Sequence, residues 1–391
     1  MKTAGSGRMI GALYRKPGPP RNLRALGSRE LPSSMPSRVY LDHAATTPLR
    51  PVARAAMLEA YDRWANPSSP HGEGRIARAA LEGARRRIAD LTGWRGAILF
   101  TSGASEGIAM VMRDAKAGRR IVSAVEHDAV RRVGEGAVTL PVDAAGRVSA
   151  AGLASAIEQA GAAPLVAVQA VNSETGVIQP SETIADAVRQ ARGLWLCDAT
   201  QAVGKMALPD ADFVAFSAHK FGGPAGVGAL LVRDLATLEP GGGQEQGYRG
   251  GTENGPGVAG MVAALDEGSG WIEGIAELRA RCDTQIEQAG GAIVARDAPR
   301  LPTIAAYRMP GMAAAAQLIR FDMAGFAVSA GSACSSGSLK PSHVLEAMGM
   351  DARAAGEVIR ISFGHTTRRE DVDRFCDQWR AICAETGVRA A

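Results

Sequence analysis

The 391-residue chain contains few cysteines, and none of its five forms a C-x-x-C pair with another. An odd number of cysteines without framework spacing is typical of a reducing compartment, and the lack of paired cysteines argues against a zinc site. No apolar run reaches membrane-spanning length. The length suffices for two domains with a sizeable core. We therefore expect a cytoplasmic protein with no membrane segment and no resident metal ion.

Acidic residues are nearly missing from residues 1–38, which hold eight Lys or Arg against the single acid Glu30. Because the whole chain has a formal net charge of +4, the remainder is slightly negative, and we expect no nucleic-acid partner. The segment is rich in Gly, Pro, Ser and Arg, which predicts disorder. Two interpretations stay open: an organelle-targeting segment, or a start assigned too early, because Met35 stands just before the first recognisable strand.

Apolar strands alternate with amphipathic helices through the rest of the chain. Strands are expected at 97–101, 121–125, 138–142, 165–171, 194–198, 213–217 and 228–232, and helices at 51–64, 76–91, 104–116, 151–160 and 181–192. This alternation predicts an α/β fold with a mostly parallel, seven-stranded sheet between helices. We assign 50–272 to this large domain. A long helix over 258–289 is expected to lead to a smaller α+β domain, formed by 39–49 and 273–391.

Lys220 is the most informative single position in the chain. It follows the predicted strand 213–217, behind a serine and a histidine and before paired glycines. A lysine in this context is well placed to form a Schiff base with pyridoxal phosphate in a dry cleft. The alternative is a solvated lysine at the start of a helix.

A carboxylate and an amide follow the neighbouring strand 194–198. Asp198 ends this strand, and a carboxylate there would keep the pyridine nitrogen of the cofactor protonated. The alternative is that Asp198 only caps the next turn. Gln201 lies one short turn further along and would reach the phenolic oxygen of the cofactor.

A phosphate site is predicted where strand 97–101 runs into a turn of small residues and then a helix. The N-terminus of a helix presents free N–H groups to an anion. Ala104 and Ser105 would supply backbone and hydroxyl donors there, joined by Ser217 and His219. Most such turns only connect elements. This turn indicates a phosphate site only in combination with Lys220 and Asp198.

Two further positions carry chemistry. His127 follows strand 121–125 and would stack on the pyridine ring and move protons, although a single histidine is more often structural. Cys334 lies in a run of small residues, 328–338, which suits an exposed and mobile nucleophile. The alternative there is a Gly/Ser linker with an incidental thiol. The other cysteines are expected to be core, structural or surface thiols: Cys197, Cys282, Cys376 and Cys383.

Together these motifs resemble the cysteine desulfurases of the class V aminotransferase group, the NifS/IscS type. The resemblance runs from about residue 39 to 373. The motifs that carry it are Leu-Asp-His-Ala-Ala-Thr-Thr-Pro at 41–48, Asn-Pro-Ser-Ser at 66–69, Thr-Ser-Gly-Ala-Ser-Glu at 101–106, Glu-His at 126–127, Asp-Ala-Thr-Gln at 198–201, Ser-Ala-His-Lys at 217–220, Arg-Gly-Gly-Thr-Glu-Asn at 249–254 and Gly-Ser-Ala-Cys-Ser-Ser at 331–336.

The resemblance implies a pyridoxal phosphate enzyme of fold type I that takes sulfur from L-cysteine and leaves L-alanine. Lys220 would hold the cofactor, His127 would stack on it, and Cys334 would carry the sulfur as a persulfide. Arg360 would clamp the substrate carboxylate. The cofactor contacts would come from Ala104, Ser105, Asp198, Gln201, Ser217 and His219, and from Thr252 of the second subunit of a homodimer. The partner would be a sulfur acceptor or an iron–sulfur scaffold protein, with at most a transient cluster on Cys334.

The chain departs from the family at two positions. Ser173 stands where an asparagine is usual, so we keep Asn172 as a candidate substrate ligand, although it would point to the other face of an extended segment. Ser105 replaces the usual threonine and keeps the hydroxyl. Three alternatives stay open: a selenocysteine lyase, another enzyme of the class V group, or a non-catalytic scaffold protein.

Overall fold

The computed structural model describes residues 38–331 and 341–386. The basic N-terminal segment and the run around Cys334 lie outside the described residues. Contacts join the chain from Val39 onward into one compact unit, so the boundaries of the two predicted domains stay a prediction. In the part of the chain that is described, no helix has the length and apolar character needed to cross a membrane.

A seven-stranded sheet forms the centre of the protein, in the order β2-β8-β7-β6-β5-β3-β4. The strands from β7 to β4 are parallel, whereas β8 runs antiparallel between β2 and β7. The bounds of the strands are β2 Ala97–Thr101, β3 Arg120–Ser123, β4 Val138–Leu140, β5 Leu165–Ala167, β6 Leu194–Asp198, β7 Phe213–Ser217 and β8 Gly228–Val232. The predicted sheet is thus confirmed, although β5 ends four residues early. Beyond it the N–H groups of Val168 and Ala170 still bond to Leu196 and Asp198 of β6, while the Gln169 N–H bonds to the Glu126 side chain.

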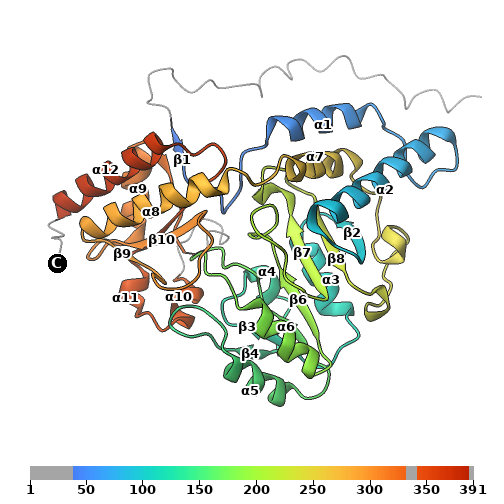
Figure 1. Ribbon diagram of the computed structural model, residues 1–391, viewed down its shortest axis with the longest axis horizontal. Helices are drawn as coiled ribbons and strands as arrows, with labels where there is room; N and C mark the ends of the chain where they lie inside the picture. The colour runs from blue at the N-terminus through green and yellow to red at the C-terminus, as the bar shows by residue number, and fades with distance from the viewer. Residues whose placement is uncertain (1–37, 332–340, 387–391) are drawn as a thin grey trace, which may run out of the picture. The chain divides into compact units, whose positions relative to one another are not determined.

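Helices cover both faces of this sheet, as the alternation of its buried side chains requires. Leu99, Ala215 and Leu230 face helix α3, Ala104–Asp114, whereas Phe100, Phe216 and Leu231 belong to the core on the opposite face. That opposite core also takes in residues of the helices α1 Pro51–Tyr61, α2 Gly72–Thr92, α5 Ala150–Ala160, α6 Ser181–Gln190 and α7 Gly255–Asp266. Figure 1 shows α7 beside α1 and α2, and these three helices are in contact.

The predicted long helix over 258–289 is wrong, because the chain forms two helices there. Helix α7 ends at Asp266, and α8 runs from Ile272 to Gln288. Gly268 lies between them with a φ of +81°, a left-handed conformation that ends a helix and that glycine adopts without steric cost.

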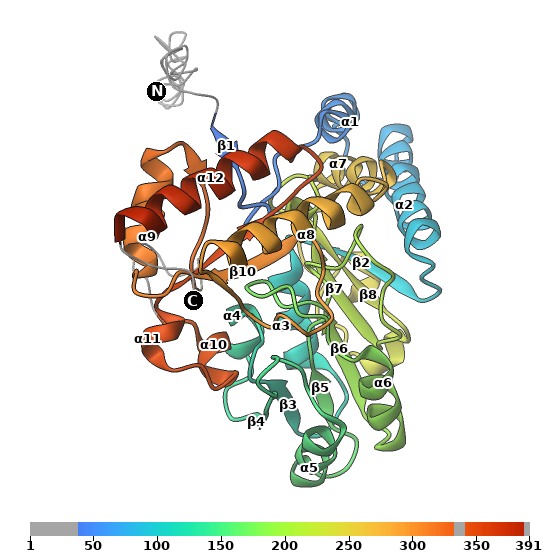
Figure 2. The same ribbon diagram turned by 60° about the vertical axis from the view of Figure 1, so that its left-hand side comes forward.

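The C-terminal part packs α8 with α9, Ala314–Met323, and α12, Arg369–Thr386, around a small antiparallel sheet (Figure 2). This sheet has the order β12-β10-β9. Strand β1 from the start of the chain pairs in parallel with β11. Strand β1, Val39–Tyr40, is the first recognisable strand that was expected after Met35. The short elements that the sequence did not predict are β9 Ala292–Ile293, β10 Ile304–Arg308, β11 Phe326–Ala327, β12 Val358–Ser362, α4 Asp128–Arg131, α10 His343–Ala347, α11 Ala352–Ala355 and the 3-10 turns η2 Ala218–Lys220, η3 Leu235–Thr237 and η4 Glu245–Gly247.

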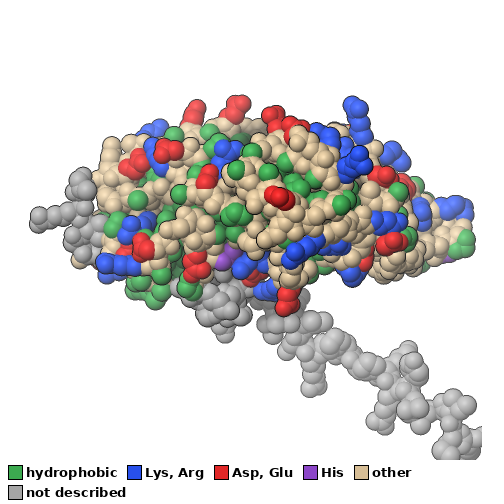
Figure 3. Space-filling view, turned by 90° about the horizontal axis from the view of Figure 1, so that it is seen from below, with side chains coloured by type: hydrophobic (Ala, Val, Ile, Leu, Met, Phe, Trp, Pro, Cys, Tyr) green, Lys and Arg blue, Asp and Glu red, His purple; other side chains and the backbone are tan. Residues whose placement is uncertain are grey.

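Charged side chains of both signs are interspersed over the face seen in Figure 3. No large area of one sign stands out on that face.

Candidate functional site

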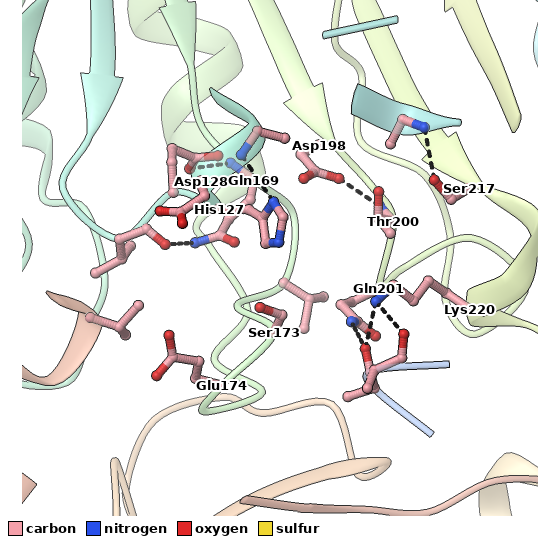
Figure 4. A pocket seen from close by; sticks show the side chains of 18 of the residues that line it. His127, Asp128, Gln169, Ser173, Glu174, Asp198, Thr200, Gln201, Ser217 and Lys220 are labelled. Atoms are coloured by element: carbon pink, nitrogen blue, oxygen red, sulfur yellow. Dashed lines mark hydrogen bonds between the residues drawn. The ribbon is translucent and has the colours of Figure 1, made fainter. Parts of the chain in front are cut away.

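A cavity of about 360 Å³ lies where the carboxyl ends of β3, β5, β6 and β7 meet the C-terminal part of the chain. Parallel strands bring their carboxyl ends to one edge of a sheet, which is the usual place for a ligand in such folds. Figure 4 shows side chains from these strand ends converging on the cavity. Of the predicted site residues, the cavity is lined by Ala104, Ser105, His127, Asp198, Gln201, Ser217, His219, Lys220 and Arg360.

Lys220 ends the short turn η2 directly after β7. Its Nζ donates to the carbonyl oxygens of Ala44 and Ala45, both at 2.8 Å. The paired glycines that follow have a packing reason, because a Cβ at Gly223 would lie 2.7 Å from that of Ala218 and Gly222 has a φ of +90°. The chain therefore turns sharply here and leaves the amine at the cavity wall.

Asp198 both caps a turn and lines the cavity, so the two interpretations of this residue are compatible. Its Oδ1 accepts from the Thr200 N–H at 2.9 Å, and the side chain is 8% exposed. Gln201 is 3% exposed, and its Nε2 donates to the Ala44 carbonyl at 2.9 Å. A carboxylate and an oriented amide thus stand on one wall of the cavity.

Another part of the cavity wall is formed by the start of α3 and the end of β7. Ser217 Oγ accepts from the Ala104 N–H at 2.7 Å, so this predicted phosphate donor already has a partner. A hydroxyl that accepts one hydrogen bond can still donate its own hydrogen. His219 Nδ1 lies 3.1 Å from Thr46 Oγ1. Burial and the positive charges of Lys220 and Lys205 lower the pKa of His219 to about 4, so its ring is neutral at neutral pH.

His127 caps the short helix α4, where its Nδ1 accepts from the Ala129 N–H at 3.1 Å. This bond fixes the orientation of the ring at the cavity wall. The adjacent Glu126 is fully buried, and this burial raises its pKa well above the usual range. Its Oε1 accepts from the Gln169 N–H at 2.8 Å. The cavity wall therefore contains a buried carboxyl group, which in the sequence is only part of the Glu-His motif.

Arg360 of β12 reaches the cavity from the C-terminal part. Its Nη2 donates to Asp42 Oδ1 at 2.8 Å and its Nη1 to the Ser173 carbonyl at 3.0 Å. Its side chain is 6% exposed. Because the guanidinium is shared between two acceptors, it is held in one orientation at the cavity wall.

Asn172 does not reach the cavity, which is lined by Ser173 instead. The Asn172 amide donates to the Val125 carbonyl at 3.1 Å, and its oxygen accepts from the N–H groups of Glu174 and Thr175, both at 2.9 Å. This geometry does not fit a substrate ligand; Asn172 shapes the turn that carries Ser173. The alternation expected for an extended segment was the signal that pointed to this outcome.

One described residue of the predicted site is not brought to the cavity: Thr252 is exposed on the glycine-rich loop before α7 and does not line it. Cys334 lies outside the described residues, so its place at the site stays a prediction. Glu174 and His343 also line the cavity wall and were not predicted as site residues. Ser342 Oγ donates to Glu174 Oε2 at 2.5 Å, and His343 Nε2 lies 2.9 Å from the Glu126 carbonyl oxygen. No periodicity distinguished these residues, because their partners are distant in sequence.

Comparisons with known proteins agree with this architecture. The model of the aminotransferase class-V family matches residues 39–375. A cysteine desulfurase of Cereibacter sphaeroides is 38% identical, with the match covering 88% of this chain and 97% of the relative. The X-ray structure of a NifS-like protein from Rickettsia africae ESF-5 has a TM-score of 0.82 at 30% identity, covering 88% of this chain and 99% of that one. A structure described as SspA in complex with cysteine has a TM-score of 0.73 at 30% identity, covering 84% and 99%.

These comparisons confirm the resemblance and the fold class predicted from the motifs. The chain belongs to the aminotransferase class-V family, and within that family it is a member of the cysteine desulfurases.

Proposed function

We propose that this protein uses pyridoxal phosphate to remove sulfur from L-cysteine, leaving L-alanine and a persulfide on Cys334. The family is generally dependent on this cofactor. The observation that carries the proposal is that an amine, a carboxylate and a set of anion donors line one cavity. The cofactor has one group for each of them: an aldehyde, a ring nitrogen and a phosphate. When bound, it supplies an electron sink for bonds at the substrate Cα.

Lys220 would hold the cofactor covalently and, once displaced by substrate, would move a proton at the substrate Cα. The two carbonyls that accept from its Nζ keep the amine at the wall while it is not engaged. Asp198 would keep a proton on the ring nitrogen, and its burial strengthens such a charge-assisted bond. Gln201 would donate to the phenolic oxygen, and His127 would stack on the ring.

The phosphate would lie at the start of α3. Ser217 can donate its hydroxyl hydrogen while its oxygen accepts from Ala104. Ser105 adds a second hydroxyl, and the helix N-terminus favours an anion. Because the His219 ring is neutral at neutral pH, it would contribute a hydrogen bond instead of a full charge.

Arg360 would take the substrate carboxylate, because a guanidinium offers two parallel donors to such a group. It lines the cavity on the side of Ser173 and Glu174. Cys334 would then accept the sulfur atom and pass it to a sulfur acceptor or an iron–sulfur scaffold protein. Cytoplasmic location follows from the cysteine content, which is typical of a reducing compartment.

The protein would act as a homodimer. Thr252 is exposed away from the cavity of its own chain, which is compatible with a contact to the cofactor of a second subunit. Large apolar side chains are also exposed on and around α1 and α2, including Leu58, Tyr61 and Ile76 at about 60% and Trp64 at 80%. A second copy of the chain would remove such side chains from water.

The decisive experiment measures alanine and sulfide released from L-cysteine by the purified protein, with and without added pyridoxal phosphate. We expect stoichiometric alanine in one turnover and a one-sulfur adduct on Cys334 by mass spectrometry. Release of selenium from selenocysteine without alanine from cysteine would instead favour the lyase alternative.

A further inference from the structure

A pocket of about 320 Å³ lies between helix α8 and the loop that joins β9 to β10. Among the described residues, it shares no lining residue with the cavity of Lys220. Its charged lining residues are three arginines, Arg279, Arg296 and Arg300, and the single acid Asp283. The wall of this pocket therefore carries more positive than negative charge.

The Asp283 carboxylate does not pair well with all three guanidinium groups. Its Oδ1 accepts from Arg279 Nε at 2.7 Å and from the Tyr307 hydroxyl at 2.6 Å. Its Oδ2 lies 3.4 Å from Arg300 Nη2 and 3.9 Å from Arg296 Nη1. Charge-assisted hydrogen bonds are normally shorter than 3 Å. Asp283 is thus a strong partner for Arg279 and a weak one for the other two arginines.

Two buried guanidinium nitrogens have no hydrogen-bond partner among the described residues: Arg279 Nη2 and Arg300 Nη1. The two side chains are 6% and 10% exposed. Folded proteins rarely leave a buried donor unpaired, and the cost is larger for a charged group. Burial and the positive charge of Arg279 lower the pKa of Arg300 in spite of Asp283. An additional acceptor with negative charge would relieve both nitrogens.

Arg296 completes the cluster from the loop side. It is 50% exposed, and Glu287 accepts from its Nε at 2.8 Å and from its Nη2 at 3.3 Å. Glu287 does not line the pocket. The remaining nitrogen, Nη1, is the one on the side of Asp283. Three guanidinium groups, one from the helix and two from the loop, thus meet at one pocket.

We infer that this pocket binds a small tetrahedral oxyanion, a phosphate or sulfate group, between Arg279, Arg296 and Arg300. Guanidinium groups suit such anions because their N–H groups form a planar fork that carries a full charge. A tetrahedral anion offers oxygen atoms in several directions, as a cluster built from two segments requires, whereas a carboxylate offers two in one plane. The pocket belongs to a separate site, so the inference does not rest on the proposed function.

Equilibrium dialysis with radiolabelled inorganic phosphate tests this site. The full-length protein is measured without cofactor and after loading with pyridoxal phosphate and removal of the excess, and one equivalent of phosphate should bind in both cases. Unlabelled sulfate should displace it, whereas acetate and chloride at equal ionic strength should not. Arg300→Gln should weaken binding about tenfold or more, because a charged hydrogen-bond donor is lost.

Two exposed arginines give a matched pair of variants. Arg296→Gln changes a half-exposed residue, so folding is not at stake, and it should weaken phosphate binding about threefold. Arg281→Gln is the control, since Arg281 lies on the same helix, is 43% exposed and pairs with Asp373 outside the pocket. Its phosphate affinity should equal that of the parent.

Three results would overturn the inference. The first is phosphate binding that acetate or chloride displaces as well as sulfate does. The second is an unchanged affinity in folded Arg300→Gln and Arg296→Gln proteins. The third is loss of the bound phosphate on cofactor loading, which would place the anion at the start of α3. If the parent protein takes up no cofactor, the proposed function fails, whereas the phosphate measurement still decides on this pocket.

Discussion

At the residue scale, a second lysine, Lys205, lies close enough to the site to be an alternative cofactor lysine. Lys205 and Lys220 are joined through Gln201 and Ala44, but only Lys220 lines the cavity. Lys220→Ala should therefore lose covalent attachment of the cofactor, and Lys205→Met should keep it. Borohydride reduction followed by peptide mapping decides between them, and label on Lys205 in the parent protein would contradict the assignment.

Asp198 should affect turnover without affecting attachment. Asp198→Ala should retain the cofactor bond to Lys220 but lose most activity, on the order of a hundredfold or more, because the ring nitrogen would no longer be held protonated. Cofactor absorbance and alanine release are measured on the same sample. Thr200→Ala is the control, since Thr200 gives Asp198 only its backbone N–H.

The four described cysteines are unsuited to the role of sulfur carrier that is proposed for Cys334. All four are buried: Cys197, Cys282, Cys376 and Cys383. The expectation that the last three could be surface thiols is therefore wrong. Burial raises the pKa of the Cys197 and Cys282 thiols well above the usual range, and a buried thiol is a poor nucleophile. Cys334→Ser should nearly abolish alanine formation from cysteine while cofactor binding persists. The control Cys383→Ala should keep most of the activity. Full activity in Cys334→Ser would refute the role of Cys334 as sulfur carrier.

At the scale of elements, the glycine-rich loop before α7 is anchored by one buried carboxylate. Glu245 accepts from Arg85 Nη1 and Nη2, both at 2.7 Å, and from the Phe100 N–H of β2 at 2.7 Å. Its side chain is 0% exposed and that of Arg85 is 12% exposed. These hydrogen bonds hold the loop that carries Thr252 against β2, the edge strand of the sheet, and give it a defined position.

Glu245→Gln should lower the free energy of unfolding by about 3 kcal/mol, because it leaves a nearly buried guanidinium without its carboxylate. Urea denaturation measures this change. The matched control is Glu59→Gln, whose partner Arg63 is 46% exposed, and this variant should cost less than about 0.5 kcal/mol. Equal effects in the two variants would show that the buried pair does not anchor the loop.

At the scale of the whole molecule, stability should fall in mild acid because of His43. This side chain is 2% exposed, and neither ring nitrogen has a hydrogen-bond partner among the described residues. Burial lowers its pKa to about 3, below the ordinary value near 6.5 that it regains on unfolding. The unfolded chain thus binds the extra proton below about pH 6.5, and stability is lost as the pH falls from there.

Between pH 6.5 and pH 5, this one group should lower the free energy of unfolding by about 2 kcal/mol. His43→Phe should reduce the pH dependence of stability over this range, with the part due to His219 remaining, as measured by urea denaturation at each pH. His71→Phe is the control, because His71 is 52% exposed. An unchanged slope in His43→Phe would show that His43 is not the group responsible.

The sequence predicted the large sheet closely and the smaller part poorly, for physical reasons. Strands β2, β6, β7 and β8 match their predicted bounds, because continuous buried runs leave little choice of register. Strands of two residues, such as β9 and β11, are too short for any periodicity. The cavity residues could be predicted because they directly follow the ends of predicted strands. The Ala44 carbonyl that accepts from Gln201 and Lys220, and the Asp42 partner of Arg360, by contrast, lie on a segment that is distant in the chain.

The segment 41–47 gives the protein an order of assembly during synthesis. Its carbonyls accept from Lys220 and Gln201, yet it is itself held by residues made last: the Ser362 N–H donates to Leu41 at 2.7 Å, and Ser362 Oγ accepts from the Ala44 N–H at 2.8 Å. One wall of the cavity must therefore wait for strand β12 to leave the ribosome, although its own residues emerge early. We therefore expect the nascent protein to acquire its cofactor only after translation is almost complete.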